Sequence, residues 1–308
     1  MKRNTTGVLL FFERHNRIFA QKVGYSRSRE TYVRYRVVLK HLTAYVRDVL
    51  RKEDIPLSEL RSSFVNGFDT YLRTGPGLAP NSVWGYMITL KHIITLARNE
   101  GMMTLNPFAS YVNSYTAVDR GYLTEDELVR LMEVPLRTEA EERVRDLFLF
   151  SAFTGLSYID IRNLRTNHVQ RYFDGHWWII TRRQKTGVTS NIRLLDVPLR
   201  IVEKYRGVRS DGRLFPVPSN NCCTENLRRL ASRCGIRTHL TFHVGRHTFA
   251  TMALNRGMPV ESLSRILGHT NIRTTQIYAK ITDKKISADM AALADSLTGV
   301  VQDIGPKL

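Results

Sequence analysis

Apolar residues recur at helical spacing through the first third of the chain. The clearest run extends from Ser28 to Leu50, where Tyr32, Tyr35, Val38, Leu39, Leu42, Tyr45, Val46 and Val49 follow one another three or four residues apart. This spacing places them on one face of an α-helix. Residues 8–100 as a whole predict four helices, and therefore a small all-helical bundle.

Turn and capping residues predict the borders of this bundle. The sequence GPGLAP at 75–80 precedes Asn81 and Ser82, either of which is a suitable N-cap for a helix that ends at Gly101. The helical pattern then lapses. We expect a helical domain over residues 1–105, a linker over 106–119, and a second domain over 120–308 with a tail from about residue 281.

The second domain has a mixed pattern. Thr124 and Glu127 form a capping-box signature, and an apolar helix is predicted over 140–153. Between 168 and 198, DG and KTG separate three short runs rich in Val, Ile and aromatic residues, which predicts a small antiparallel sheet. Helices resume near 199 and 222, at 243–256, at 259–267 and around Tyr278. The predicted fold class is mainly α with a small antiparallel β-sheet.

The charge balance changes the picture from a generic helical protein to one with a polyanionic partner. The 308 residues contain 46 Lys and Arg against 28 Asp and Glu, a net charge of +18. Residues 1–110 and the remainder each contribute +9, so both domains are basic. Nucleic acid is the first candidate partner. The alternative is a merely soluble basic surface.

One predicted helix carries much of this charge. Residues 22–52 hold nine basic and two acidic residues, and the polar face of the 28–50 helix carries Arg29, Arg34, Arg36 and Lys40. An exposed charged face is usually only solvated. The excess of positive charge here favours a face that contacts DNA phosphates.

The sequence gives little support for a membrane or secreted location or for a cofactor. No apolar run is long enough to cross a membrane, and the charged N-terminal stretch is not a signal peptide. Cys222, Cys223 and Cys234 lack metal-ligand spacing and predict free thiols in a reducing cytoplasm. We expect no metal site and no cofactor.

Five residues suggest a reaction. His243 and Arg246 lie three apart at a predicted helix start, so both face one side and can clamp an anion. His269 follows a glycine that ends a helix, Tyr278 comes nine residues later, and Lys185 lies in a turn between two strands. This set suits phosphoryl transfer: Tyr278 as nucleophile, Lys185 as general acid, and three donors to phosphate oxygens.

The segment HVGRHTFATMALNRGMPVESLSRILGHTNIRTTQIYAK resembles the signature of the tyrosine recombinases, the phage-integrase type of site-specific DNA recombinase. In detail it is most similar to conjugative-transposon integrases and DNA invertases. The resemblance extends from about residue 8 and is most specific at 243–280. It implies a SAM-like core-binding domain and a mixed α+β catalytic domain that close on DNA as a clamp. It also implies a 3′-phosphotyrosyl intermediate at Tyr278, a general acid at Lys185, and no ATP or obligatory metal.

The resemblance also implies partners. They are double-stranded DNA with inverted-repeat core sites and three further copies of the chain, which is a monomer when free and forms a homotetramer on DNA. Accessory DNA-bending proteins are further candidates. The implied location is the nucleoid of a bacterial cell. Larger integrases add an N-terminal arm-binding domain that this sequence does not show. We therefore expect either a simple invertase-like recombinase or a chain lacking that domain.

The chain departs from the family pattern at Ser157, which stands where the first catalytic arginine is usual, while Asp160 matches a supporting acidic residue. Either the chain is a degenerate DNA-binding regulator, or another cation compensates. Candidates are Arg162, Arg165, Arg183 and Arg193, of which the last two are favoured because they flank the Lys185 turn.

A type IB topoisomerase is a further alternative, because it uses related tyrosine chemistry. The tail argues against it. Ile286, Met290, Leu293 and Leu297 have helical spacing that predicts docking on a neighbouring protomer, the alternative being packing within the same chain.

Overall fold

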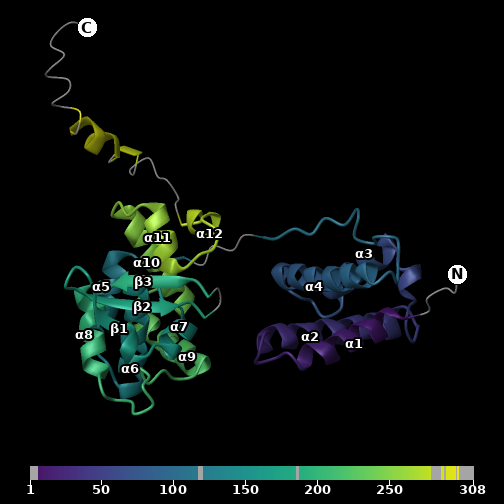
Figure 1. Cartoon of the computed structure of the whole chain (residues 1–308), viewed down its shortest axis with the longest axis horizontal. Helices are drawn as coiled ribbons and strands as arrows, with labels where there is room; N and C mark the ends of the chain where they lie inside the picture. Colours follow the sequence, from purple (N-terminus) through teal and green to yellow (C-terminus); the bar gives the residue numbers. More distant parts are fainter. Residues whose placement is uncertain are drawn as a thin grey trace, which may run out of the picture. The chain divides into compact units, whose positions relative to one another are not determined.

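The structure is a computed structural model that describes residues 6–116, 121–184, 187–278, 286–287, 289–295 and 297. The chain divides into two compact units, Met1–Val118 and Asp119–Leu308 (Figure 1). The described residues are mostly helical and include one three-stranded antiparallel sheet, which confirms the predicted fold class. None of the described helices is long and apolar enough to cross a membrane.

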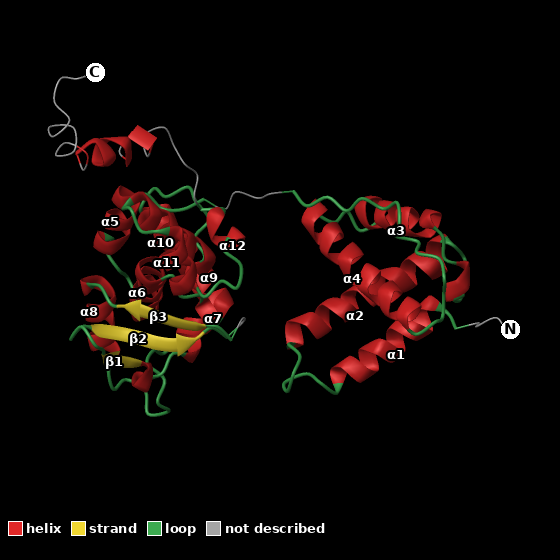
Figure 2. Ribbon diagram, turned by 45° about the horizontal axis from the view of Figure 1, so that its top comes forward, coloured by secondary structure: helices red, strands yellow, loops and turns green. Residues whose placement is uncertain are grey.

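The N-terminal unit is a helical bundle, as Figure 2 shows. Its described α-helices are α1 (Val8–Ala20), α2 (Arg29–Ala44), α3 (Ser62–Thr74) and α4 (Pro80–Asn99). Ser28 caps α2 by accepting a hydrogen bond from the backbone N–H of Thr31. The apolar faces of these helices form one buried core, with Phe12, Phe68 and Met87 fully buried.

A π-helical turn, Tyr45–Val49, ends α2 and changes the predicted apolar face. The N–H of Leu50 donates to the carbonyl of Tyr45, five residues back, at 3.1 Å. This extra residue rotates the following side chains relative to an α-helix. Tyr45 and Val46 remain buried, whereas Val49 is 52% exposed, so its expected place on the apolar face is wrong.

The expected N-cap of α4 is also wrong. The helix begins at Pro80, one residue before Asn81, because proline suits the first helical position, where its missing N–H costs no hydrogen bond. Asn81 instead binds Thr116: its Nδ2 donates to the carbonyl at 2.8 Å and its Oδ1 accepts from the N–H at 3.0 Å. The side chain therefore ties a distant segment to α4.

The segment 106–116, part of the predicted linker, is irregular but packed. Phe108 is 3% exposed within the N-terminal core. The Tyr111 hydroxyl donates to Asp69 of α3 at 2.6 Å, and Asn113 donates to the carbonyl of Trp84 in α4 at 3.1 Å. This segment belongs to the N-terminal unit by its contacts.

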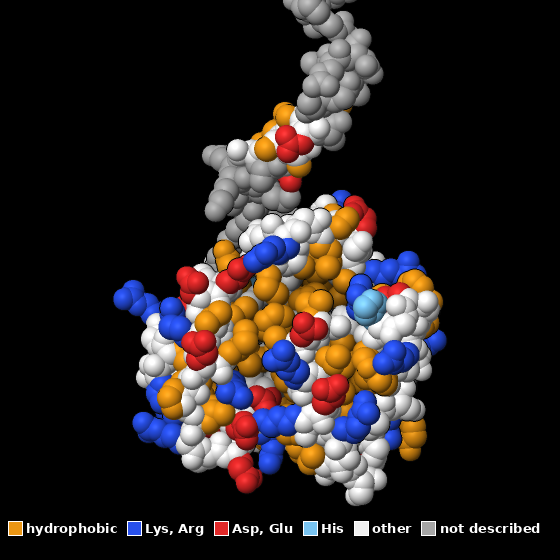
Figure 3. All heavy atoms as spheres, turned by 90° about the vertical axis from the view of Figure 1, so that its left-hand side faces the viewer, with side chains coloured by type: hydrophobic (Ala, Val, Ile, Leu, Met, Phe, Trp, Pro, Cys, Tyr) orange, Lys and Arg blue, Asp and Glu red, His pale blue; other side chains and the backbone are white. Residues whose placement is uncertain are grey.

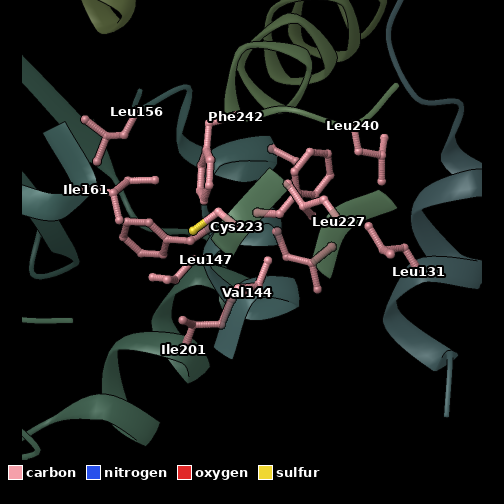
Figure 4. Close-up of a cluster of buried hydrophobic side chains, with 14 of the residues drawn as sticks. Leu131, Val144, Leu147, Leu156, Ile161, Ile201, Cys223, Leu227, Leu240 and Phe242 are labelled. Carbon is pink, nitrogen blue, oxygen red and sulfur yellow. The ribbon is translucent and has the colours of Figure 1, made fainter. Parts of the chain in front are cut away.

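The C-terminal unit surrounds a central helix, α6. Its described helices and strands are α5 (Glu125–Glu133), α6 (Glu139–Thr154), α7 (Tyr158–Asn163), β1 (Val169–Arg171), β2 (Trp177–Arg182), β3 (Thr189–Arg193), α8 (Asp196–Tyr205), α9 (Asn220–Arg233), α10 (Phe242–Asn255), α11 (Val260–Leu267) and α12 (Arg273–Gln276). Figure 4 shows the core, in which Val144 and Leu147 of α6 lie among Ile201, Leu227 and Phe242 of the surrounding helices. The core thus fixes α6 against α10, which carries most of the site described below.

Two sequence predictions in this unit are confirmed. Thr124 and Glu127 form the capping box at the start of α5. The strands pair antiparallel in the order β1-β2-β3, and Ile179 of β2 lies opposite Ile192 of β3, both buried. The sheet also contacts α11 through β3, which brings the end of β2 close to the end of α11.

Candidate functional site

The site is built at the start of α10, where the helix packs closely on α6. Thr241 caps α10 by accepting a hydrogen bond from the N–H of Val244. Gly245 permits the close approach, because a Cβ added there would lie 3.1 Å from the Ser151 hydroxyl of α6. The packing turns Arg246 towards the C-terminal ends of α6 and α11.

Arg246 is held in a cage of acceptors. Its Nη1 donates to the carbonyl of Gly155 at 2.8 Å, and its Nη2 donates to the carbonyl of Leu267 at 2.7 Å and to Nε2 of His269 at 2.9 Å. Gly155 and Leu267 lie at the ends of α6 and α11, where backbone carbonyls carry partial negative charge. Burial lowers the pKa of Arg246.

Tyr278 is 9% exposed and lies two residues after the end of α12. Its ring stands perpendicular to His247 at 4.7 Å between ring centres and nearly parallel to His269 at 6.5 Å. Burial raises the pKa of Tyr278, while the charge of the nearby Arg246 opposes that shift. The candidate nucleophile is therefore a neutral phenol with a guanidinium close by.

The two predicted histidines have different surroundings. His243 is exposed, and its Nε2 lies 2.9 Å from Nε2 of His247 one turn later. One of these two nitrogens must donate and the other accept. His269 is partly buried, and burial together with Arg246 and Arg183 lowers its pKa to about 4.

Ser157 serves as a helix cap. It opens α7 by accepting from the N–H of Asp160, and its hydroxyl donates to Oδ2 of Asp160 at 2.6 Å. Asp160 also accepts from the N–H of Gln184 at 3.0 Å. Burial opposes ionisation of Asp160, but these bonds and the charge of Arg183 outweigh it and keep its pKa below the usual range.

Arg183, which directly follows β2, brings a second guanidinium to the cluster. It is 3% exposed, with Nη1 3.0 Å from Oδ2 of Asp160. Its Nη2 donates to Ile266 at 2.7 Å and reaches, at 3.5 Å, the Gly155 carbonyl that Arg246 also binds. Burial and the neighbouring Arg246 lower the pKa of Arg183 to about 10, so it remains charged at neutral pH.

Gly268 makes room for this arginine. It ends α11 in the left-handed conformation, with φ of +64°, and a Cβ there would lie 2.5 Å from Cγ of Arg183. The glycine of the LGH motif is therefore needed for the backbone conformation and for the passage of Arg183.

The other candidate arginines lie elsewhere. Arg193 is half-exposed and 3.9 Å from Asp174. Arg165 reaches the carbonyl of Asp211 at 3.5 Å, and Arg162 is exposed. Among the described residues, Arg183 alone of the four pairs with Asp160, shares the Gly155 carbonyl with Arg246 and lowers the pKa of His269.

The structure does not show every predicted residue in this cluster. Lys185 falls outside the described residues. Arg29, Arg34, Arg36 and Lys40 are all exposed on α2, in the N-terminal unit. Within the described residues, no three His, Cys, Asp or Glu side chains are grouped to hold a metal ion.

Two residues at the site were missed by sequence reasoning. His247 contacts both His243 and Tyr278. Thr275 is fully buried, and its hydroxyl lies 2.8 Å from Nδ1 of His269. Their spacing was a usable signal: His247 lies one turn after His243, and Thr275 lies three residues before Tyr278.

Comparisons with known proteins decide the family. The profile of the phage integrase family matches residues 121–285, more than half of the chain, and that of the phage integrase SAM-like domain matches residues 8–116. The chain belongs to the phage integrase family. The resemblance read from the sequence is confirmed.

Curated relatives are tyrosine recombinases. XerA of Pyrococcus furiosus is 30% identical over 190 residues, covering 58% of this chain and 64% of that protein. XerC of Oceanobacillus iheyensis is 25% identical over 225 residues, covering 67% and 72%. The match to the XerA relative thus spans less than two thirds of its length.

Solved structures show the same fold. A fragment of the Tn1549 transposon integrase, in complex with a circular intermediate DNA, matches with a TM-score of 0.70 at 18% identity, covering 94% of this chain and 99% of that one. A lambda integrase dimer bound to a COC′ core site gives 0.68 at 18% identity, covering 89% and 95%. Both domains of this chain therefore have structural counterparts in integrases.

The lowered pKa of His269 predicts a pH-dependent stability. The folded protein keeps this ring neutral down to about pH 4, whereas the unfolded chain protonates it near the ordinary pKa of 6.5. The unfolded state therefore binds the extra proton between these values, and acidification from pH 7 to 4.5 lowers the free energy of unfolding. His269→Gln is expected to lose less stability over that interval in urea titrations. An equal loss in both proteins would contradict the neutral ring.

Proposed function

We propose that the protein is a site-specific DNA recombinase that cleaves and rejoins strands of double-stranded DNA through a 3′-phosphotyrosyl intermediate. The observation that carries the proposal is the pair of buried guanidinium groups, Arg183 and Arg246, on one carbonyl beside the Tyr278 hydroxyl. Two fixed cations beside a phenol suit a reaction that develops negative charge on phosphate oxygens.

The chemistry assigns a role to each group. The Tyr278 oxygen attacks phosphorus and its proton passes to water; a P–O bond to Tyr278 forms, and the P–O5′ bond breaks. The departing 5′-oxygen takes a proton from Lys185, the proposed general acid. Arg246, Arg183 and His243 bind the non-bridging oxygens. Attack by the 5′-hydroxyl of a partner strand then reverses these steps, which requires no external energy source.

Arg183 takes the place of the arginine that position 157 lacks. Ser157 supports this role indirectly, because its hydroxyl and N–H hold Asp160, and Asp160 holds Arg183. A buried arginine paired with a carboxylate keeps its orientation better than an exposed one. The sheet, in this proposal, supplies the cation that a helix supplies in the usual arrangement.

A DNA-binding regulator without chemistry is the second candidate, because Ser157 departs from the family pattern. The charge contributed by Arg183 favours the enzyme. The exposed basic face of α2, with Arg29, Arg34, Arg36 and Lys40, serves DNA binding in both cases. Inverted-repeat core sites are the proposed substrates, at the nucleoid.

The tail provides a route to the proposed homotetramer. Ile286, Met290 and Leu297 are 50, 58 and 43% exposed. Figure 3 shows hydrophobic side chains gathered on the face of the C-terminal unit where α5 and α8 lie. A cavity of about 700 Å³ between α5 and α10 is lined by residues that include Met132, Phe153, Phe249 and Met252. We expect the tail of one protomer to fill this cavity of another.

Replacement of Tyr278 tests the nucleophile. Sites for the full chain are first selected by binding from random duplexes, and a nick is then placed in the crossover region so that cleavage traps the enzyme. Tyr278→Phe is expected to bind with parental affinity and to form no covalent adduct in denaturing gels. Tyr122→Phe, which alters a tyrosine 46% exposed and outside the cluster, serves as the matched control and forms the adduct.

Two outcomes of this experiment overturn the assignment. A denaturation-resistant adduct in Tyr278→Phe would exclude this nucleophile. Absence of any adduct in the parent protein would favour the regulator. An assay for strand exchange distinguishes a recombinase from a topoisomerase, because a topoisomerase reseals the strand that it cuts and gives no recombinant product.

Matched substitutions of Arg183 and Arg193 test which residue replaces the arginine that is missing at position 157. Arg183→Ala is expected to slow adduct formation by about 10²–10³-fold, the scale of losing one donor to a developing oxyanion. Arg193→Ala is expected to cleave at the parental rate. Binding is measured separately by anisotropy, because a general loss of DNA affinity would also slow cleavage. If Arg193→Ala slowed cleavage and Arg183→Ala did not, the cation that compensates for Ser157 would be Arg193 of β3.

The tail is tested with two adjacent substitutions. Met290→Glu places a charge among the predicted docking side chains and is expected to stop assembly beyond isolated protein–DNA complexes in sedimentation experiments. Ala291→Glu, on a different side of the helical segment, is expected to assemble normally. Normal assembly of Met290→Glu would exclude this docking mode.

A further inference from the structure

The hydrogen bonds of His269 determine which ring nitrogen carries its proton. Nε2 lies 2.9 Å from Nη2 of Arg246, and Nδ1 lies 2.8 Å from Oγ1 of Thr275. A guanidinium has only donors, so Nε2 must offer its lone pair. The proton of the neutral ring therefore resides on Nδ1 and is donated to the Thr275 hydroxyl.

The ring is neutral under ordinary conditions. Burial, Arg246 and Arg183 lower the pKa of His269 to about 4. A protonated Nε2 would also direct an N–H at the N–H groups of Arg246. The charged groups that face this ring thus favour the same state as the hydrogen bonds do.

Thr275 is fixed in position by the backbone around it. Its side chain is fully buried, and its N–H donates to the carbonyl of Ile272 at 2.7 Å. Its own carbonyl accepts from the N–H of Tyr278 at 3.0 Å. The residue that accepts the hydrogen bond from His269 is therefore also hydrogen-bonded to the backbone of the proposed nucleophile.

The donors of Arg246 show why the tautomer matters. A guanidinium has five N–H groups. Three of them bind Gly155, Leu267 and His269, which leaves two for the Tyr278 hydroxyl and an incoming phosphate oxygen. The His269 lone pair thus helps to hold the guanidinium in the orientation that directs the remaining donors to the reacting atoms.

We propose that Thr275 is a positioning residue: its hydroxyl accepts from the Nδ1–H of the tautomer that Arg246 selects and thereby anchors the His269 ring, so that Nε2 remains an acceptor that orients Arg246. The role in cleavage rests on the proposed recombinase function, whereas the tautomer is a property of the protein alone. Without the Thr275 oxygen, the Nδ1–H is left in a buried position with no acceptor. Nε2 still faces a donor, so the proton stays on Nδ1, but the ring loses its anchor and holds Arg246 less firmly.

Three variants separate this role from simple packing. Thr275→Val keeps the shape and removes the hydroxyl, Thr275→Ser keeps the hydroxyl, and His269→Gln identifies the His269 signals. Long-range ¹H–¹⁵N spectra of full-length protein labelled at histidine distinguish the two tautomers at neutral pH without DNA. The parent and both Thr275 variants are expected to show Nδ1–H at His269, and in Thr275→Val the Nδ1–H proton resonance is expected to move upfield, because it no longer donates a hydrogen bond.

Cleavage provides the second readout. Thr275→Val is expected to slow covalent adduct formation by about ten- to a hundredfold, the scale of one unsatisfied buried polar group, with DNA affinity retained. Thr275→Ser is expected to restore most of the rate. Thermal unfolding of each variant checks that the fold persists, and Thr275→Ser carries the test if Thr275→Val unfolds.

Different results would refute the positioning role of Thr275 and the proposed recombinase function. An Nε2–H tautomer in the parent, or an unchanged Nδ1–H resonance and rate in Thr275→Val, would refute the positioning role. Nε2–H in Thr275→Ser would refute it as well. A parent that shows Nδ1–H but forms no adduct would refute the recombinase function and leave the role of Thr275 in anchoring His269 intact.

Discussion

The buried guanidinium of Arg246 is the constraint on which the site depends. Its acceptors are two backbone carbonyls and one neutral imidazole, while the nearby carboxylate, Asp160, pairs with Arg183. A buried cation without a directly paired carboxylate is costly unless its hydrogen bonds are satisfied. The C-terminal ends of α6 and α11 and the ring of His269 must therefore meet around the start of α10.

Two glycines make this meeting possible. Gly155 and Gly268 end α6 and α11 in the left-handed conformation, with φ of +68° and +64°. Neither position has room for a side chain. A Cβ added at Gly155 would approach Phe249 and Leu267, and one added at Gly268 would approach Arg183. The same backbone turns that expose the carbonyls to Arg246 thus admit the second arginine.

Much of the fold was predictable because it follows from local rules. The periodicity of Tyr35, Val38 and Leu42 predicts α2, and the capping box at Thr124 predicts the start of α5. The wrong predictions fall where a second structural feature overrides a local sequence rule. Val49 turns outwards because a π-turn adds one residue, and Asn81 binds Thr116 because Pro80 already starts the helix.

The site was predictable as a set of residues but not as a network. The spacing of His243, Arg246, His269 and Tyr278 is local in the sequence, so the motif selects them. The choice of Arg183 over Arg193 depends on how β2 packs against the end of α11, which the sequence pattern does not encode. The same holds for Thr275, whose importance appears only when the donor inventory of Arg246 fixes the His269 tautomer.

The central claim is that a guanidinium from the sheet replaces the one that position 157 lacks. The most direct measurement is the single-turnover cleavage rate of the Arg183→Ala/Ser157→Arg double variant on a nicked site, compared with Arg183→Ala. The double variant is expected to regain part of the lost rate, because it returns a cation to the same phosphate. A double variant no faster than Arg183→Ala, with both proteins folded and bound to DNA, would contradict it.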